Sequence, residues 1–348
     1  MKPVPKATID DVAKLAGVSI KTVSRVVNRE PNVRESTRAK VDKAVGELNY
    51  RPNLSARNLA SQRSHLIVLV YDDPSAYQVA SSGYVIRMQE GTLRACKEAN
   101  YELLIHPCNY RNKNVQGELN AIIEQMRPDG FVIAAPLSNM PEIVDAIAAT
   151  DTPFVRLSPG RQNGSEFLVT TNDRQVSAEM TRYLASLGHE RIAFIRGNPN
   201  HKAVGNRFKG YRDGLAHRNL PFVEELVATG DNSIASGAEA AEELLALENP
   251  PTAIFAANDD MAAGVIRAAY RLGIDVPAQL SVAGFDDSSL ARQIYPALTT
   301  VRQPLASMAE IAAATLISHA GKGDMPTRTE IVPATVQMRD STGPAPEK

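Results

Sequence analysis

Residues Asp10–Asn28, DDVAKLAGVSIKTVSRVVN, decide the fold of the N-terminal part of the chain. Apolar residues recur at helical spacing on both sides of Gly17, and glycine allows a tight turn because it tolerates positive φ. Ser19 is placed to cap the second helix by accepting a hydrogen bond from a backbone N–H near Thr22. The pattern of helix, short glycine turn and helix predicts a helix-turn-helix.

A third helix, ESTRAKVDKAVGELNY at residues 35–50, supplies apolar residues for a small three-helix core. The second helix then turns its valines inward and presents four side chains outward: Ile20, Lys21, Ser24 and Arg25. Such residues in the first half of a recognition helix reach base edges in the major groove, and Arg25 suits the O6 and N7 atoms of guanine. The segment therefore predicts binding to double-stranded DNA.

Other side chains of this region are expected to contact phosphates, which position a protein on DNA without reading its sequence. Side-chain hydrogen bonds are expected from Thr22, Ser24, Asn28, Thr37 and Asn53, and positive charge from Arg34, Arg51 and Arg57. An amphipathic helical hairpin with a solvated charged face is the alternative interpretation of the same pattern.

The distribution of charge favours DNA. The chain has 348 residues and a formal net charge of -1, but residues 1–63 hold 13 of its 38 Lys/Arg and only 6 of its 39 Asp/Glu. The first 63 residues thus carry about +7 and the remainder about -8. A basic segment attached to an acidic body predicts a polyanionic partner for the basic segment alone.

After residue 64, short apolar runs such as HLIVLVY and TAIFAAND alternate with amphipathic segments of helical period. Continuous apolar strands separated by helices predict α/β architecture with parallel sheets covered on both faces. We count ten candidate strands, which suit two lobes better than one sheet, with crossings between the lobes near residues 171–172, Pro304 and Thr327. The polar tail STGPAPEK at residues 341–348 is expected to fray.

Several classes of protein are disfavoured by what the sequence lacks. Its two cysteines, Cys96 and Cys108, are expected to be buried thiols in a reducing compartment, and we find no signal peptide and no apolar run of about 20 residues. We therefore expect a cytoplasmic protein without membrane contact. Nucleotide-binding and hydrolase motifs are absent and the six histidines show no ligand spacing, so we expect no catalytic residue, no metal and no cofactor. A periplasmic solute receptor and an α/β enzyme are the competing classes.

The segment from Ala7 to Ala60 resembles the headpiece of the lactose repressor (LacI/GalR) family of bacterial transcriptional regulators. The similarity rests on VAKLAGVSIKTVSRVVN, on VRESTRAKVDKAVGELNYRPN and on ARNLA, and it continues in the body through ANDDMAAGVIRA, SVAGFDD and LTTVRQP. The resemblance implies a two-lobed effector domain similar to periplasmic sugar-binding proteins.

Three parts follow from this resemblance. We expect a helix-turn-helix DNA-binding headpiece at residues 1–52, a hinge helix and linker at residues 53–63, and an effector-binding and dimerisation domain at residues 64–348. The first lobe of that domain would take residues 64–171 and 304–326, and the second lobe residues 172–303 and 327–340.

The resemblance assigns roles in DNA binding. Ile20, Lys21 and Arg25 would read bases, with Ser19 among the contacts, and the family selects its operator with the first two of these positions. Leu59, followed by Ala60, would be a wedge of the hinge helix that enters the minor groove and kinks the duplex, with Arg57 beside it. Two copies of the chain would act together on a palindromic operator.

Effector candidates lie where strands end, because ligands of such lobes bind at the carboxyl ends of the strands. By this rule the candidates are Asp72, Arg156, Asn258 and Asp286. Arg207, at the opening of a predicted helix, Asn232, in GDNS, and Tyr84, which could supply an aromatic surface to the ligand, are added to them. By resemblance, Arg207, Asn258 and Asp286 occupy positions that hydrogen-bond ligand hydroxyls. The alternative role of Asn258 and Asp286 is to cap the helices that follow them. The alternative for Tyr84 is that it is a core residue.

Two departures from the lactose repressor bear on the effector. Asn232, in GDNS, stands where that protein has a tryptophan, and Arg156 stands where it has an aspartate. Two arginines near the ligand suggest a sugar acid or sugar phosphate, with a neutral sugar as the other possibility. We expect a homodimeric repressor of carbohydrate genes that a sugar-derived inducer releases from DNA; a corepressor-dependent repressor is the alternative.

Overall fold

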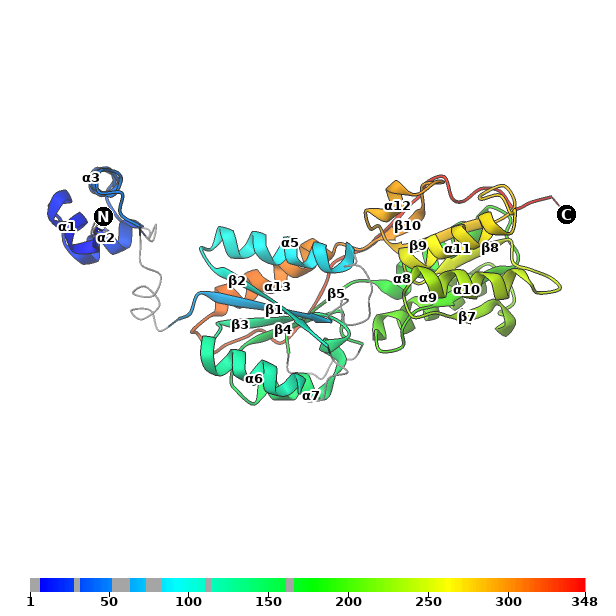
Figure 1. The fold of residues 1–348 in the computed structure, drawn as a ribbon, viewed down its shortest axis with the longest axis horizontal. Coiled ribbons are helices and arrows are strands. Elements are labelled where there is room, and N and C mark those ends of the chain that lie inside the picture. Colours follow the sequence, from blue (N-terminus) through cyan, green and yellow to red (C-terminus); the bar gives the residue numbers. More distant parts are fainter. Residues whose placement is uncertain are drawn as a thin grey trace, which may run out of the picture. The chain divides into compact units, whose positions relative to one another are not determined.

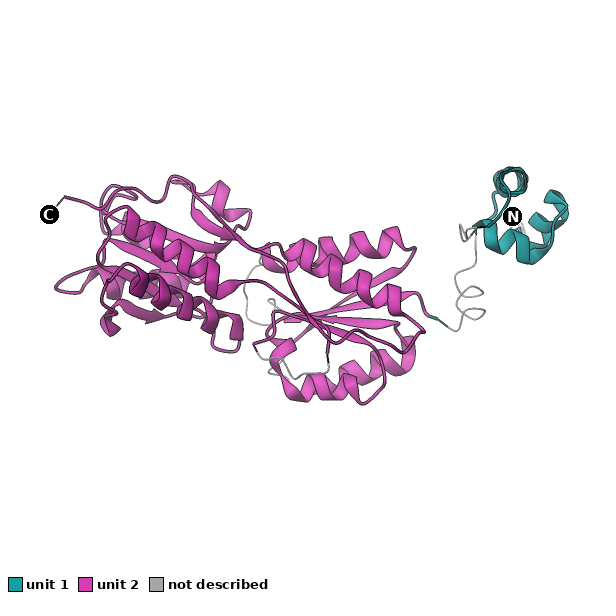
Figure 2. Cartoon of the chain, turned by 180° about the vertical axis from the view of Figure 1, so that it is seen from behind, with its two compact units in different colours: residues 1–63 teal, residues 64–348 magenta. Residues whose placement is uncertain are grey.

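The computed structural model describes residues 7–27, 32–51, 63–72, 83–109, 114–160 and 166–347. The chain divides into two compact units, residues 1–63 and residues 64–348 (Figure 2). Each unit has hydrophobic core residues of its own.

Among its described residues, the first unit contains three helices, α1 (Ile9–Ala16), α2 (Ile20–Val27) and α3 (Glu35–Glu47). Thr8 and Asp11 form a reciprocal capping box at the start of α1, and Gly17 ends that helix with a φ of 66°. The three helices meet around a small buried core of Val12, Ala13, Val23, Val26, Val41 and Ala44. The helix-turn-helix is thus packed by the residues that the pattern of valines and alanines predicted.

The first lobe of the second unit is a six-stranded parallel sheet in the order β11-β5-β4-β3-β1-β2 (Figure 1). Its strands are β1 (Leu66–Asp72), β2 (Glu102–Cys108), β3 (Gly130–Ile133), β4 (Phe154–Leu157), β5 (Leu168–Thr170) and β11 (Thr329–Ile331). The helices α5 (Gly83–Glu98) and α13 (Leu305–His319) cover one face, and α6 (Val115–Met126) and α7 (Pro141–Ala148) cover the other.

Strand β1 shows why its apolar run is continuous rather than alternating. Ile67 and Leu69 belong to the core beneath α5 and α13, whereas Val68 and Val70 belong to the core beneath α6 and α7. All four side chains are fully buried. A strand in a parallel sheet with helices on both faces has no solvent-facing side, so every position selects an apolar residue.

The second lobe is also a six-stranded sheet, in the order β12-β10-β9-β8-β6-β7, with only β12 antiparallel to its neighbour. Its strands are β6 (Ile192–Arg196), β7 (Val227–Thr229), β8 (Ala253–Ala256), β9 (Ser281–Asp286), β10 (Thr299–Arg302) and β12 (Thr335–Gln337). Its helices are α8 (Asp173–Ser186), α9 (Lys202–His217), α10 (Ile234–Leu245), α11 (Asp259–Arg271) and α12 (Leu290–Gln293), and short 3-10 turns lie at Leu137–Asn139 in the first lobe and Glu224–Leu226 in the second.

The chain passes between the lobes three times. Two passages, after β5 and between β10 and α13, lie where the sequence placed them. The third does not lie near Thr327, because β11 pairs with β5 in the first sheet and only β12 belongs to the second. The first lobe therefore extends to Ile331, and the expected boundary at residue 326 is corrected.

The expectation that the tail frays is wrong for its first half. Ser341 and Thr342 are buried, and the backbone N–H of Val282 donates to the carbonyl of Ser341 over 2.8 Å. The Ser341 hydroxyl accepts from the backbone N–H of Thr299 and donates to the carbonyl of Val282. Polar residues stay ordered here because they complete hydrogen bonds that two strands would otherwise lack. Among the helices described, none is long and apolar enough to cross a bilayer.

Candidate functional site

Helix α2 presents a continuous outward surface. Val23 and Val26 are buried, whereas Lys21 and Arg25 are exposed and Ile20 keeps 47% of its surface accessible. A single exposed apolar side chain is common on protein surfaces, but Ile20 shares its helix face with two cations. It suits a surface that contacts both the polar edges and the methyl groups of bases.

Ser19 and Thr22 order the start of this helix. The backbone N–H of Thr22 donates to Ser19 Oγ over 3.2 Å, and the two hydroxyl oxygens lie 2.9 Å apart. Of the other predicted contacts, Arg34 and Arg51 are exposed and Ser24 and Thr37 are partly exposed. The remaining predicted DNA contacts lie outside the described residues: Asn28, Asn53, Arg57, Leu59 and Ala60.

In the second unit, a group of charged and aromatic side chains gathers where strands of the second lobe end and α5 of the first lobe begins. We call Tyr84, Asp173, His201, Arg207 and Asp286 the interlobe cluster, together with Asn258, which follows the Ala257 carbonyl that Arg207 binds. Asp286 ends β9, Asp173 begins α8, and Tyr84 lies in the first turn of α5. Because parallel strands place their carboxyl ends at one edge, this is where a two-lobed α/β protein concentrates its polar groups.

Arg207 holds the cluster together. Its Nε donates to Asp173 Oδ1 over 3.0 Å, one terminal nitrogen donates to the carbonyl of Ala257 over 2.6 Å, and the same nitrogen lies 3.9 Å from Asp286 Oδ1. The guanidinium carbon stands 3.8 Å from the ring centroid of Phe285. Only 8% of the side chain is exposed, so this cation is fixed in direction before any ligand arrives.

The carboxyl of Asp286 has an altered proton affinity. Burial raises its pKa to about 7, against the opposing effect of Arg207 and of a hydrogen bond from Gln303. Burial also raises the pKa of Asp173, and Arg207 again opposes it. A φ of 124° at Asp286 is a backbone conformation that side-chain-bearing residues rarely adopt, and such strain concentrates at binding sites.

Asn258 both caps a helix and joins two loops. Its Oδ1 accepts from the backbone N–H of Met261, which caps α11, and its Nδ2 donates to the carbonyl of Asn232 over 2.9 Å. Asn232, at a φ of 80°, accepts with its own side chain from the backbone N–H of Asn198. The capping alternative for Asn258 is thus correct as structure. Within the described part of the chain, these bonds use one amide hydrogen and one lone pair of Asn258, which leaves one of each for a ligand.

Arg156 does not join the interlobe cluster through any contact found among the described residues. Its Nε donates to the carbonyl of Ser138 over 2.7 Å, and a terminal nitrogen lies 2.6 Å from Glu166 Oε2. The Arg156 side chain is 5% exposed and that of Glu166 is 15% exposed. The charge of Arg156 is therefore already matched inside the first lobe.

Tyr84 spans the boundary between the lobes. Its ring meets the ring of His201 edge to face with centroids 6.5 Å apart, while its other side packs against the core of the first lobe. Burial raises its pKa, and the charges of Arg207, Asp286 and Asp173 act on its hydroxyl. Tyr84 is accordingly both a core residue and part of the cluster. Asp72 lies partly exposed at the end of β1.

The candidate residues chosen from the sequence include neither Asp173 nor His201. Asp173 follows β5 by three residues, so the rule that selected Asp286 would also have found it. Burial, together with the positive charge of Arg207, lowers the pKa of His201 to about 4, so the imidazole is neutral near pH 7. The hydroxyl of Ser158, at the end of β4, is buried without a hydrogen-bond partner within the described structure, a further group that a ligand could satisfy.

The cluster combines fixed donors and acceptors with no nucleophile activated by an adjacent base. Arg207 donates, Asn258 both donates and accepts, and Asp286 accepts or donates according to its protonation. This arrangement suits recognition of neighbouring hydroxyl groups through paired hydrogen bonds. It gives no support for a covalent catalytic step, which would require a nucleophile and base in contact.

Comparison with known proteins agrees with both units. Residues 8–53 match the bacterial regulatory proteins of the lacI family, and residues 181–342 match the periplasmic binding protein-like domain. The probable HTH-type transcriptional repressor ExuR of Bacillus subtilis (strain 168) is 33% identical over 334 residues, covering 96% of this chain and 98% of that protein.

Two solved structures share the fold. The lac repressor dimer bound to operator and the anti-inducer ONPF has a TM-score of 0.76 at 26% identity, covering 97% of this chain and 100% of the other. The complex of the transcriptional regulator CelR with cellobiose has a TM-score of 0.74 at 27% identity, covering 96% and 99%.

A helix-turn-helix unit and a periplasmic-binding-protein-like effector unit in one chain define a DNA-binding transcriptional regulator. The chain belongs to the lacI family of bacterial regulatory proteins. The resemblance drawn from the sequence and the expected α/β fold are both confirmed. The relatives named above are regulators rather than enzymes.

Proposed function

We propose that this regulator is a homodimeric repressor of genes for carbohydrate use that leaves its palindromic operator when a sugar binds between the lobes. The observation that carries the proposal is the interlobe cluster, in which a buried, oriented Arg207 adjoins Asp286 and Asn258 at the strand ends. A solved relative of similar fold holds cellobiose, and another is a repressor dimer on its operator. A DNA partner supports a cytoplasmic location for the proposed repressor.

The charges of the site favour a neutral sugar over a sugar acid or phosphate. The two arginines that suggested an anionic ligand each lie against a carboxylate, Arg207 against Asp173 and Arg156 against Glu166. An anion would have to compete with these ion pairs or leave a carboxylate buried without its partner, which is costly. Hydroxyl groups need only the remaining hydrogen-bonding capacity of Asn258, Asp286 and Ser158.

On the DNA side, Ile20, Lys21 and Arg25 of α2 are proposed as the base readers. Their exposure, beside the buried Val23 and Val26, is the support from the structure. Leu59, outside the described residues, is proposed as the minor-groove wedge on the strength of the family resemblance. In a dimer, two α2 helices would contact half-sites about one helical turn apart or a multiple of it.

The proposed mechanism is a shift between two arrangements of the lobes. Tyr84 and Asp286 come from different lobes, so a ligand that bridges them favours one relative placement. The placement of the lobes sets the spacing of the two headpieces in the dimer. The inducer releases DNA only to the extent that it binds the DNA-incompetent arrangement more tightly.

A selection of operator sequences from a random duplex library, followed by titration of the selected site with sugars, tests the proposal. We expect an inverted repeat, and at least one neutral sugar that weakens binding to it. A hit that tightens DNA binding would replace induction by corepression, and failure to enrich any inverted repeat would refute the proposal. Turnover of the hit, measured in parallel, would contradict a purely regulatory role.

Asp286→Asn and Lys322→Ala form a matched pair of variants for this titration. Asp286→Asn keeps the size of the side chain but removes its charge, so we expect it to weaken sugar binding and leave the affinity for operator intact. Lys322 lies exposed after α13, outside the interlobe cluster, and its replacement should change neither.

A further inference from the structure

A second group of side chains lies away from the interlobe cluster, between β2 and α6 of the first lobe. His106 and Cys108 are two residues apart on β2, so both side chains project from the same face of the sheet. Glu118 comes from the first turn of α6, which covers that face. One potential ligand atom from each residue lies within 4.8 Å of the others.

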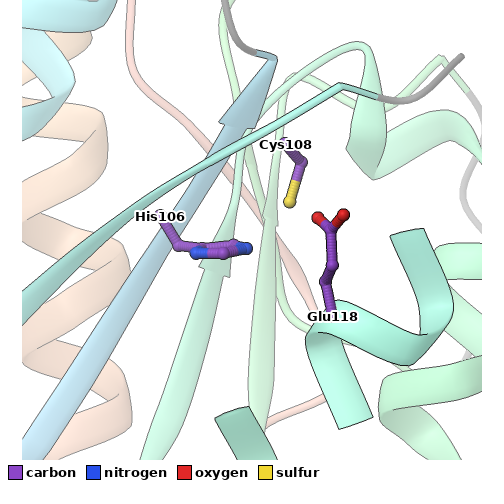
Figure 3. Close-up of side chains that lie close together, drawn as sticks. All are labelled: His106, Cys108 and Glu118. Carbon is purple, nitrogen blue, oxygen red and sulfur yellow. The ribbon is translucent and has the colours of Figure 1, made fainter. Parts of the chain in front are cut away.

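The three functional groups converge on one point. Figure 3 shows the imidazole of His106, the sulfur of Cys108 and the carboxylate of Glu118 directed toward one another from the strand and the helix. Cys108 is fully buried, and the other two residues are partly buried. The Nε2 atom of His106 is buried without a hydrogen-bond partner within the described structure. A buried imidazole nitrogen in that state is an unsatisfied polar atom that a ligand would satisfy.

We propose that His106, Cys108 and Glu118 form a binding site for Zn²⁺. Zinc is bound in proteins by imidazole nitrogen, thiolate sulfur and carboxylate oxygen, most often with four ligands, so a water would complete the set. A thiolate together with an imidazole disfavours Mg²⁺ and Ca²⁺, which take oxygen ligands. Binding would convert the Cys108 thiol to a thiolate and release its proton to solvent.

The site would connect two elements that pack against each other through apolar side chains. Strand β2 is the edge strand of its sheet, bonded to β1 alone among the described strands, and α6 packs beside it. A metal ion bound by two residues of β2 and one of α6 would fasten this edge to its helix. The proposal does not depend on the effector, because the three residues lie apart from the interlobe cluster.

The alternative is an ordinary ion pair between His106 and Glu118 beside a buried thiol. The two alternatives differ in what Cys108 does. In an ion pair Cys108 is a passive core residue, whereas in a metal site its sulfur is a ligand, and sulfur bound to cobalt gives an absorption band that the other two ligands do not.

The test uses the full-length protein, reduced, stripped of metal with a chelator and titrated with Zn²⁺ or Co²⁺ alone. We expect one equivalent per chain, a sulfur-to-cobalt charge-transfer band, and displacement of Co²⁺ by Zn²⁺ but not by Mg²⁺. Cys108→Ser should abolish the band, and His106→Gln and Glu118→Gln should weaken Zn²⁺ binding by about tenfold or more, as loss of even an outer partner of a ligand does.

Cys96→Ser is the matched control. Cys96 is the other buried cysteine, in the core beneath α5 and α13, and burial raises the pKa of its thiol to about 12, so it stays protonated. We expect this variant to keep the band and the affinity. A band that persists in Cys108→Ser, or affinity unchanged in both His106→Gln and Glu118→Gln, would overturn the proposal.

A thermal melt of each protein completes the test, because Cys108→Ser removes a core sulfur and could unfold the lobe without any metal. Zn²⁺ should raise the melting temperature of the unaltered protein and of Cys96→Ser, in proportion to the logarithm of its concentration. Glu118→Gln lies at the more accessible edge and should fold normally without this rise. An equal rise in the unaltered protein and in folded Glu118→Gln would contradict the site.

Discussion

Asp286 is a buried site residue whose conformation and ionisation are both unfavourable for the stability of the fold. It is buried beside Arg207, its backbone has a φ of 124°, and burial raises the pKa of its carboxyl to about 7. Ionisable groups with a pKa near neutrality and strained backbone conformations are both concentrated at functional sites. We expect Asp286 to form a hydrogen bond with the bound ligand.

This elevated pKa makes stability depend on pH. An unfolded aspartate ionises near 3.8, so between about pH 4 and 7 the folded state binds more protons and its stability falls as pH rises, by up to about 1.4 kcal/mol per pH unit. Above about pH 7 the effect ends. Denaturant melts of the unaltered protein and of Asp286→Asn should therefore diverge over this window. Parallel pH curves would show that Asp286 ionises normally when folded.

At the DNA surface, Arg25→Ala should cost about 1–3 kcal/mol of binding free energy on the selected operator and relax the preference at one base pair. The expected reason is loss of a bidentate contact with guanine. Lys43→Ala is the control, because Lys43 lies on α3, 79% exposed, and pairs with Glu47. Fluorescence anisotropy on operator and scrambled duplexes measures both variants, and equal losses on both duplexes would argue that Arg25 contacts only phosphate.

The sequence identified individual site residues unevenly. Asn258 and Asp286 could be selected because they lie where strands end, and Arg207 because it matches a ligand-binding position of the family. In the structure Arg207 donates to the carbonyl of Ala257, which precedes Asn258, and lies 3.9 Å from Asp286. The pairing of Arg156 with Glu166 could not be predicted from the sequence, because the two residues are ten positions apart across a loop and no periodic pattern links them. An arginine near the site suggests an anionic ligand, but not when a carboxylate of the protein already neutralises its charge. The sequence does not show such pairs, so it leaves open whether the ligand is neutral or anionic.

At the scale of elements, helix pairs in the second unit depend on close backbone approach. A Cβ atom added to Gly91 of α5 would lie 1.9 Å from the carbonyl oxygen of Ala306 in α13, and the backbone cannot yield without separating the helices. Both helices cover the same face of the first sheet. Glycine at this position is therefore required by packing rather than by its φ.

Gly91→Ala should accordingly destabilise the second unit by about 1–3 kcal/mol, the usual cost of overpacking. Gly205→Ala in α9 is the control, since nothing lies within 4 Å of its added Cβ and alanine favours helix, so a gain of about 0.5–1 kcal/mol is expected. Urea melts with unchanged slopes would measure both. Similar effects of the two substitutions would show that helix propensity, not contact with Ala306, decides the outcome.

Elements with strong apolar patterns were predictable and short ones were not. The ten candidate strands all occur, because runs of Val, Ile, Leu and Phe bounded by turn residues identify buried parallel strands. Strands β11 and β12, TEI and TVQ, contain a single apolar residue each, so they show no apolar run. They pair because β5 and β10 offer open edges, a property of the fold that no local stretch encodes.

For the whole molecule, the informative feature is that one polypeptide carries two kinds of binding surface on separate compact units. The acidic body would be repelled by DNA, so attraction to DNA is confined to the basic first unit. Three passages of chain join the lobes of the body. A ligand bound by residues of both lobes would therefore change the placement of one lobe relative to the other by bending these passages. The sequence predicted this organisation because charge and periodicity change together near residue 64.

If the two surfaces are coupled as proposed, the coupling must be reciprocal. A sugar that weakens operator binding by a given factor, about 5- to 150-fold for typical coupling, must itself bind more weakly by the same factor when operator is present. Calorimetric titration of the sugar into free protein and into the operator complex gives the factor by which operator changes the affinity for sugar. Titration with operator, with and without sugar, gives the factor by which sugar changes the affinity for operator. A scrambled duplex serves as control, because it engages the basic unit without requiring the same arrangement of lobes. Unequal factors would mean that sugar and operator do not act on the same equilibrium between two lobe arrangements. Dissociation of the dimer is one such case, and the protein would then leave DNA because the second headpiece is lost.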